Sequence, residues 1–300
     1  MPSPVPQLLA WYRKYKRDLP WRTTANPYRI FVSEMMLQQT QVDRVIPKYT
    51  QFLKHFPTWT SLARARTNDL IHAWAGLGYN RRALYAREAA KTVLAAKKSP
   101  HTEEEWRRLK GVGPYMAAAL AEFVNGKRAI VMDTNVRRVV GRIWLGLPYP
   151  RTSHDPQIIR VLQKITPHTS GHADLPQAFM DFANAVCLPR TPACASCPLR
   201  TSCKASKRFL SGRPILRTTH YARRTERIHR DKKHPDRIYR GRILSWIRKH
   251  GTWNVQRLGP HIDEAFDHIA DQDWIRAMAD RLVKDGLLAW KIKNILSLPQ

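Results

Sequence analysis

Residues 109–120 read LKGVGPYMAAAL, and this stretch predicts a tight connection between two helices. Gly111 and Gly113 allow a sharp turn, and a run of small residues after it suits a helix beginning near Pro114. Backbone N–H groups at the start of such a helix can point at a phosphate. Any turn between two helices can use glycines, so the motif gains meaning only from its neighbours.

The chain around this turn has a helical pattern from Leu8 to about Cys203, in which apolar residues recur at spacings of three and four residues. Frequent proline and glycine breaks keep the expected helices short, so we predict an all-α bundle. Residues 206–236 are basic, poor in apolar residues and without a period, which is typical of a linker. Two helices and a terminal hairpin within 237–300 predict a small winged-helix-like domain.

The charge balance points to a polyanionic partner. The 300 residues contain 52 Lys and Arg but only 23 Asp and Glu, a formal net charge of +29. The basic residues are spread along the chain instead of forming a juxtamembrane block, which favours nucleic acid over a membrane surface. No segment has the length of a membrane span and no secretory signal begins the chain, so we expect an intracellular protein.

All four cysteines lie in one short window with the spacing C-x6-C-x2-C-x5-C: Cys187, Cys194, Cys197 and Cys203. In a reducing compartment such clustered thiols indicate a metal site and not disulfides. Four soft sulfur ligands suit an iron–sulfur cluster or a structural zinc ion, although zinc sites usually show two paired C-x2-4-C knuckles and only one pair is present.

Two carboxylates stand out by their context. Glu34 lies four residues after Ile30 and three before Leu37, on an apolar face of an expected helix, where desolvation should raise its pKa. Asp133 follows the apolar segment 129–132 and precedes a helix. Each has a plainer interpretation: Glu34 as a surface residue, and Asp133 as a helix N-cap.

Several motifs together resemble the MutY family of adenine DNA glycosylases, within the helix-hairpin-helix endonuclease III superfamily. The motifs are DLPWR at 18–22, PYR at 27–29, SEMMLQQTQV at 33–42, VIP at 45–47 and GLGY at 76–79, and the likeness extends from residue 8 to about 205. The resemblance implies a helix-hairpin-helix glycosylase fold and favours a [4Fe-4S] cluster on the four cysteines. It also implies an iron–sulfur domain (1–20 and 131–205) and a six-helix domain (21–130), with the flipped base bound between them.

The resemblance assigns roles to individual residues. Glu34 is expected to protonate the departing base, Asp133 to stabilise the cationic sugar and Asn135 to assist it. Tyr115 stands where bifunctional relatives carry a lysine nucleophile, so no Schiff base and no strand cleavage are expected. Contacts to the base or to DNA are expected from Trp21, Arg22, Leu37, Gln39, Tyr79, Gly111, Gly113 and Gln177. Of these, Gln39 matches a wedge residue and Gln177 an adenine-edge contact, unless Gln177 is simply a solvated helix residue.

The sequence departs from the family pattern at three places. Thr134 replaces a glycine, Asn80 replaces a second aromatic residue after GLGY, and residues 204–300 lack the Nudix-like domain that reads 8-oxoguanine.

From the resemblance as a whole, we expect a monomeric, monofunctional glycosylase that binds double-stranded DNA and removes adenine opposite 8-oxoguanine or guanine. The alternatives are a mismatch thymine or uracil glycosylase acting on G:T or G:U and, less favoured, a non-catalytic DNA-binding protein.

Overall fold

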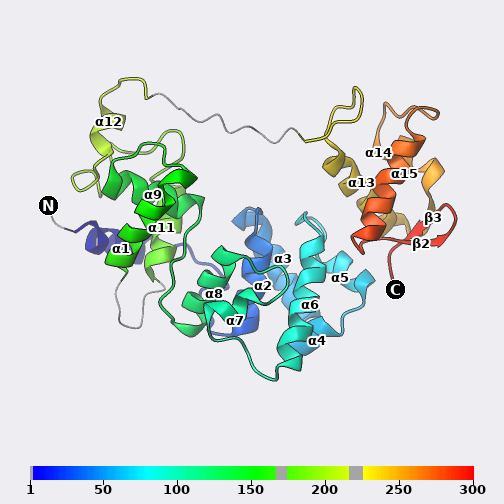
Figure 1. Cartoon of the computed structure of the whole chain (residues 1–300), viewed down its shortest axis with the longest axis horizontal. Coiled ribbons are helices and arrows are strands. Elements are labelled where there is room, and N and C mark those ends of the chain that lie inside the picture. The colour runs from blue at the N-terminus through cyan, green and yellow to red at the C-terminus, as the bar shows by residue number, and fades with distance from the viewer. Residues whose placement is uncertain (1–2, 167–173, 216–225) are drawn as a thin grey trace. The chain divides into compact units, whose positions relative to one another are not determined.

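The structure is a computed structural model that describes residues 3–166, 174–215 and 226–300 (Figure 1). It is built mainly of short helices, as the sequence pattern predicts, and it divides into two compact units. One unit combines the chain up to Phe31 with Ser99–Thr219, and the other combines Val32–Lys98 with His220–Gln300. No helix in these described ranges is both long enough and apolar enough to cross a membrane.

The first unit contains the N-terminal helix and the helices of the middle of the chain. Helix α2 (Pro27–Leu37) starts in this unit and ends in the second. The other elements of the first unit are α1 (Pro4–Tyr15), α7 (Glu103–Arg107), α8 (Pro114–Asn125), α9 (Thr134–Leu145), the 3-10 turn η1 (Thr152–His154), α10 (Asp155–Ile165), α11 (Asp174–Ala185) and α12 (Ser206–Leu210).

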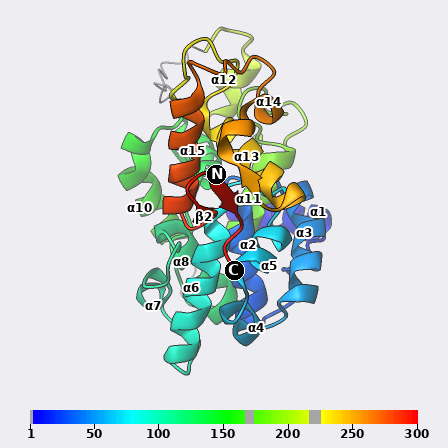
Figure 2. The same ribbon diagram turned by 90° about the vertical axis from the view of Figure 1, so that its right-hand side faces the viewer.

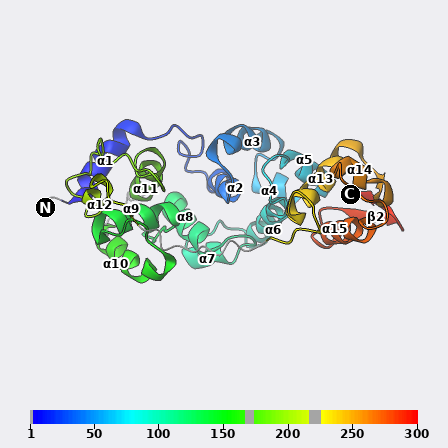
Figure 3. The ribbon, with the colours of Figure 1, turned by 90° about the horizontal axis from the view of Figure 1, so that it is seen from above.

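The core of the first unit forms where α11 packs against α1 and α9, and α10 against α9 (Figure 3). Val136, Val140 and Phe182 are among its fully buried side chains. Asp181 of α11 lies at the edge of this core and pairs with two arginines, at 2.7 Å from Arg17 and 2.7 Å from Arg22. This ion pair ties the segment after α1 to α11.

The glycine-rich turn predicted from the sequence joins α7 to α8. Gly111 has φ +82°, in the left-handed region that glycine adopts without strain. Gly113 is the N-cap of α8 and Pro114 its first residue, where the missing N–H of proline costs no hydrogen bond. Contacts between α7 and α8 complete a helix-hairpin-helix arrangement.

The second unit combines the helices after α2 with the C-terminal part of the chain. Its elements are α3 (Val42–His55), α4 (Trp59–Ala63), α5 (Thr67–Ala73), α6 (Arg81–Ala95), α13 (Asp236–His250), β1 (Trp253–Asn254), η2 (Val255–Arg257), α14 (Gly259–Ile262), α15 (Gln272–Lys284), β2 (Ala289–Ile292) and β3 (Ile295–Ser297).

The C-terminal segment 236–300 contains the two helices and the hairpin that the sequence predicts. Helices α13 and α15 lie side by side (Figure 2), and β3 lies between β1 and β2 in an antiparallel sheet. The core of this segment also takes in Ile71 of α5, with Leu84 of α6 packed against it. Arg81 of α6 also pairs with Asp285, which follows α15, at 3.2 Å.

Part of the basic segment before α13 is anchored to this C-terminal core. Lys232 is buried and lies 2.5 Å from Asp271 and 2.8 Å from Asp263. His229 stacks on Trp274 with ring centroids 4.8 Å apart. Other residues of the expected linker, including Arg223 and Arg224, lie outside the described residues.

We predict that Asp181→Asn lowers the free energy of unfolding by roughly 3 kcal/mol near neutral pH, because it leaves the Arg22 guanidinium half-buried without its counter-charge. Burial alone would raise the pKa of Asp181, but the hydrogen bonds and charges of Arg22 and Arg17 outweigh it and hold that pKa below its usual value. The stabilisation is therefore full above the unfolded-state pKa of about 4 and is lost as the pH falls through the native one. Urea denaturation of both proteins across this range measures it.

The matched control is Asp174→Asn, an exposed carboxylate at the start of the same helix. It should change the free energy of unfolding by well under about 1 kcal/mol. An equal loss of unfolding free energy in both variants contradicts a stabilising ion pair at Asp181. So does a difference between Asp181→Asn and wild type that persists unchanged to low pH.

Candidate functional site

Helix α2 carries the first of the two candidate carboxylates. Glu34 is only 7% exposed, between Ser33 and Met35, which are fully buried. Glu34 is therefore buried, as predicted, and its catalytic role stays a prediction. Proline at the start of α2 and apolar residues around its circumference produce this buried helix, so a carboxyl group is held in an interior position.

The end of α2 is joined to the GLGY turn by a buried arginine of α6. Nη1 of Arg82 donates to the carbonyl oxygens of Met35, Met36 and Gln38, at 2.8, 3.0 and 2.6 Å. Burial lowers the pKa of Arg82 to about 10, so the side chain remains charged at neutral pH. These carbonyls belong to the end of a helix, where backbone acceptors lack intrahelical partners.

Nη2 of the same arginine holds the other segment. It donates to the hydroxyl of Thr40 at 3.0 Å and to the carbonyls of Leu77 and Gly78 at 3.2 and 3.1 Å. Two residues with expected DNA contacts, Gln39 and Tyr79, lie in the segments that Arg82 connects, and both are exposed. Both have positive φ, +56° and +46°.

The second candidate carboxylate, Asp133, caps α9. Its Oδ1 accepts from the backbone N–H groups of Asn135 and Val136 at 2.8 and 2.7 Å, and its Oδ2 accepts from Nδ2 of Asn135 at 2.7 Å. The N-cap interpretation is therefore correct, and it is compatible with a reactive role because a carboxylate has about four acceptor positions. The positive end of α9 stabilises the anion.

Arg138 connects Asn135 to the first cysteine. Its Nη2 donates to Oδ1 of Asn135 and to the carbonyl of Ala183, both at 3.0 Å, and its Nε donates to the carbonyl of Cys187 at 2.8 Å. Asp133 and the cysteine segment are thus parts of one hydrogen-bonded network within the first unit. Burial lowers the pKa of Arg138, and the Cys187 thiol partly offsets this.

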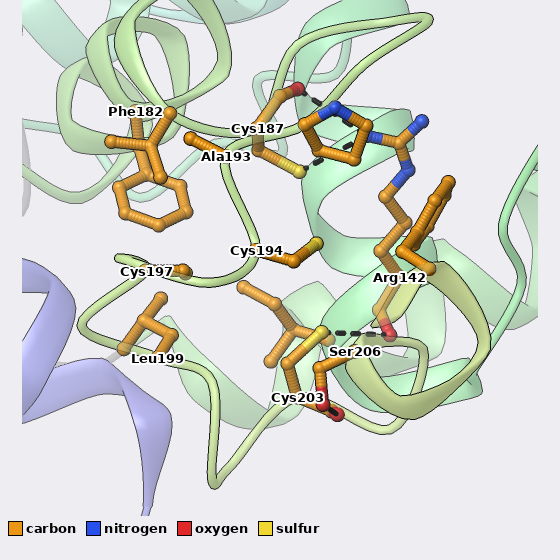
Figure 4. Close-up of a pocket in the computed structure, with 13 residues that line it drawn as sticks. Arg142, Phe182, Cys187, Ala193, Cys194, Cys197, Leu199, Cys203 and Ser206 are labelled. Atoms are coloured by element: carbon orange, nitrogen blue, oxygen red, sulfur yellow. Dashed lines mark hydrogen bonds between the residues drawn. The ribbon is translucent and has the colours of Figure 1, made fainter. Parts of the chain in front are cut away.

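The four cysteines line a single pocket, together with apolar side chains such as Ile143, Phe182 and Leu199 (Figure 4). Burial raises the pKa of the Cys197 thiol to about 11. Burial is also the main cause of the raised pKa values of Cys194 and Cys203, and the neighbouring thiols add to it. One buried and three partly buried thiols thus line one space.

Arg142 closes one side of this pocket. It donates to Sγ of Cys187 at 3.3 Å and to the carbonyls of Leu188, Pro189 and Pro148 at 2.7, 2.9 and 2.8 Å. A cationic donor beside the sulfurs suits ligands that bind metal as thiolates. No three His, Cys, Asp or Glu side chains in the described ranges are placed to hold a single metal ion. Four soft sulfur donors that line one pocket suit an iron–sulfur cluster or a zinc ion.

The remaining predicted site residues have varied surroundings in the first unit. The Tyr115 hydroxyl lies 3.9 Å from Sδ of Met180, and the half-buried Gln177 accepts from the Tyr12 hydroxyl at 3.1 Å, so its amide is oriented from within the fold. Trp21, for which a contact to the base or to DNA is expected, is buried. Arg22 makes a two-point contact with Asp181.

Sequence analysis missed Arg82, Arg138 and Arg142. A signal for Arg82 exists, because it shares the buried stripe of α6 with Ala86, Ala89 and Val93 at helical spacing. An arginine within an apolar stripe indicates a buried guanidinium, whose partners must then come from elsewhere in the fold.

Comparison with known proteins identifies the family. The family model described as HhH-GPD superfamily base excision DNA repair protein matches residues 32–167. An adenine DNA glycosylase of Mycolicibacterium smegmatis is 35% identical over 254 residues, 83% of this chain and 82% of that protein. One of Mycobacterium tuberculosis is 40% identical over 196 residues, and the match spans 64% of each chain, slightly under two thirds.

Solved structures agree with the helical architecture. A thermostable thymine-DNA glycosylase superposes with a TM-score of 0.63 and 26% identity, covering 68% of this chain and 95% of that one. Endonuclease III in a non-covalent DNA complex superposes with a TM-score of 0.59 and 18% identity, covering 69% of this chain and 95% of that one. At this identity the similarity supports the fold alone. The chain therefore belongs to the HhH-GPD superfamily of base excision DNA repair proteins and, within it, to the family of the adenine DNA glycosylases.

Proposed function

We propose that this protein is a monofunctional DNA glycosylase that hydrolyses the N-glycosidic bond of adenine mispaired with 8-oxoguanine or guanine in double-stranded DNA. The observation that carries the proposal is the pair of carboxylates in unlike environments, Glu34 within a buried helix and Asp133 at a helix N-terminus. The adenine specificity rests on the relatives, which are adenine DNA glycosylases.

In this proposal Glu34 acts as the general acid. Protonation of a ring nitrogen turns adenine into a good leaving group, and a carboxyl group in an apolar setting can retain its proton near neutral pH. The burial of Glu34 supports this role. Gln177, oriented by Tyr12, is proposed to contact the adenine edge through the free capacity of its amide.

Asp133 is proposed to stabilise the positive charge that develops on the sugar. Breaking the bond produces an oxocarbenium-like transition state, and an anion fixed in place beforehand lowers its energy without reorganising. Three N–H donors from Asn135 and Val136 fix the carboxylate. With tyrosine at position 115, the chain lacks there the amine that a Schiff base needs, and so we propose no strand cleavage.

The four cysteines are proposed to bind a [4Fe-4S] cluster with a structural role, since hydrolysis of a base needs no electron transfer. Their shared, largely apolar pocket and the Arg142 donor suit bound thiolates, and the presence of only one C-x2-C pair favours the cluster over a structural zinc ion. Through Arg138, the cysteine segment also contacts Asn135, and so the cluster loop helps to hold the polar partner of Asp133. We retain three proposed functional domains: an iron–sulfur domain (residues 1–20 and 131–205), a six-helix domain (21–130) and a winged-helix-like domain (237–300).

The test of activity is single-turnover excision on duplexes with a central A opposite 8-oxoguanine, A opposite G, T opposite G or U opposite G. We expect strand breaks at adenine only after alkali, because a monofunctional enzyme leaves an abasic site. Cleavage at T or U alone overturns the adenine specificity and supports the second candidate, a mismatch pyrimidine glycosylase. That candidate is favoured by the structural similarity to a thymine-DNA glycosylase.

We predict that Glu34→Gln lowers the single-turnover excision rate by roughly 10²–10⁴-fold, since the amide cannot donate the carboxyl proton. Duplex affinity and thermal stability should change little, because Gln has nearly the same volume. The control is Glu88→Gln, an exposed glutamate of α6. Retained excision in Glu34→Gln excludes Glu34 as the acid.

We predict that purified protein contains iron and inorganic sulfide, with little zinc, and absorbs visible light. Cys197→Ala should abolish this absorption, because every corner of a cubane cluster needs a thiolate. Elemental analysis and absorption spectra of the two proteins check this. One equivalent of zinc without iron contradicts the cluster assignment and points to a structural zinc site.

A further inference from the structure

Arg82 links two loops that are distant in sequence. Its two terminal nitrogens serve different segments: Nη1 binds carbonyls at the end of α2, and Nη2 binds the turn at Leu77 and Gly78. Thr40 strengthens the link, because its hydroxyl accepts from Arg82 and donates to the carbonyl of Leu77 at 3.2 Å. We name this set of contacts the Arg82 clamp.

The clamp needs a guanidinium group in particular. A planar fork presents several N–H donors in fixed directions, whereas lysine concentrates its donors on one nitrogen. One ammonium group cannot reach both the helix end and the turn with the same geometry. Arg82 is only 6% exposed, so water cannot replace the lost hydrogen bonds.

The two clamped segments contain residues in a costly backbone conformation. Gln39 and Tyr79 both have φ in the left-handed region, which is uncommon for residues other than glycine. Such conformations persist when the surrounding structure over-determines them, and they concentrate at functional sites. Here the clamp fixes the backbone on both sides: Gln38 and Thr40 flank Gln39, and Gly78 precedes Tyr79.

Arg82 also supports the Tyr79 ring directly. Its guanidinium carbon lies 5.6 Å from the ring centroid, and 5.5 Å from that of the buried Trp74. Tyr79 nevertheless remains 55% exposed, so the ring keeps a surface on which a nucleic acid base can stack. The exposed Gln39 side chain extends from the neighbouring loop.

We propose that Arg82 is a positioning residue that fixes the spacing between Gln39 and Tyr79, so that both engage the distorted duplex at the same time. This inference rests on the proposed function, in which these two side chains contact DNA. Gln39 fills the gap left by the extruded base while Tyr79 stacks beside it, and the rigid link between them favours the extruded state. Displacement of reacting groups by about 1 Å can cost about 10²-fold in rate.

The test compares Arg82→Lys with Arg87→Lys. Arg87 is a matched control because it lies on the same helix and also donates to a carbonyl and a threonine hydroxyl, those of Ala65 and Thr67. The fluorescence of 2-aminopurine placed opposite 8-oxoguanine measures base extrusion. Single-turnover kinetics on a duplex with adenine measure excision. Thermal denaturation and affinity for undamaged duplex report the fold and general DNA binding.

We expect Arg82→Lys to lower both the extrusion signal and the excision rate by at least about tenfold, with affinity for undamaged duplex within about twofold of wild type. Arg87→Lys should keep both activities. Equal losses in the two variants, or wild-type extrusion in Arg82→Lys, overturn the proposal.

A second measurement does not depend on glycosylase activity. Hydrogen exchange of the free protein should accelerate in residues 38–40 and 76–80 of Arg82→Lys, but not in Arg87→Lys, because only the first loses the clamp. Unchanged exchange in both segments rejects the clamp even in an active enzyme. If exchange accelerates but wild-type protein excises no adenine, the proposed function fails and the clamp stands.

Discussion

The hydrogen bond from a buried arginine to a backbone carbonyl is the interaction on which the irregular parts of this fold depend. A guanidinium removed from water must satisfy several donors at once, and carbonyls at helix ends and turns are the acceptors left without partners. The buried Arg82 and Arg142 use this match at the end of α2 and beside the pocket of the four thiols, and the partly buried Arg138 uses it between α9 and the cysteine segment. Helices supply the bulk of the structure, and these three side chains fix the loops between them.

The two carboxylates proposed for catalysis have unlike surroundings. Glu34 is buried, on a helix made largely of apolar residues. Asp133 faces the N–H groups that begin α9, an environment that favours charge. The same division between a neutral acid and a fixed anion serves other enzymes that cleave glycosidic bonds. In the proposed mechanism, this division follows from the position of Glu34 within a buried helix and of Asp133 at the N-terminus of another.

Local patterns predicted the parts of the structure that depend on neighbouring residues. Apolar periodicity located the helices, including the two C-terminal ones, Gly111 and Gly113 located the turn, and short apolar runs near the end of the chain predicted the hairpin. The partners of Arg82 in α2 were not predictable in this way, because Met35 and Met36 lie more than forty residues away and only folding brings them together. The ion pair of Arg22 with Asp181 was missed for the same reason, and so a residue assigned to DNA contact also stabilises the fold.

The capping of α9 by Asp133 has a consequence for how genetic variation at this position is interpreted. The carboxylate serves folding through its N-cap bonds and is proposed to serve chemistry through the same two oxygens. Loss of a cap typically costs about 1 kcal/mol of stability, and destabilisation of that size can change the steady-state amount of a protein in a cell several-fold. With the role proposed for Asp133, a variant at position 133 reduces both the turnover of each molecule and the number of molecules. A repair deficiency measured in cells reports the product of the two, and only normalisation to folded protein separates them.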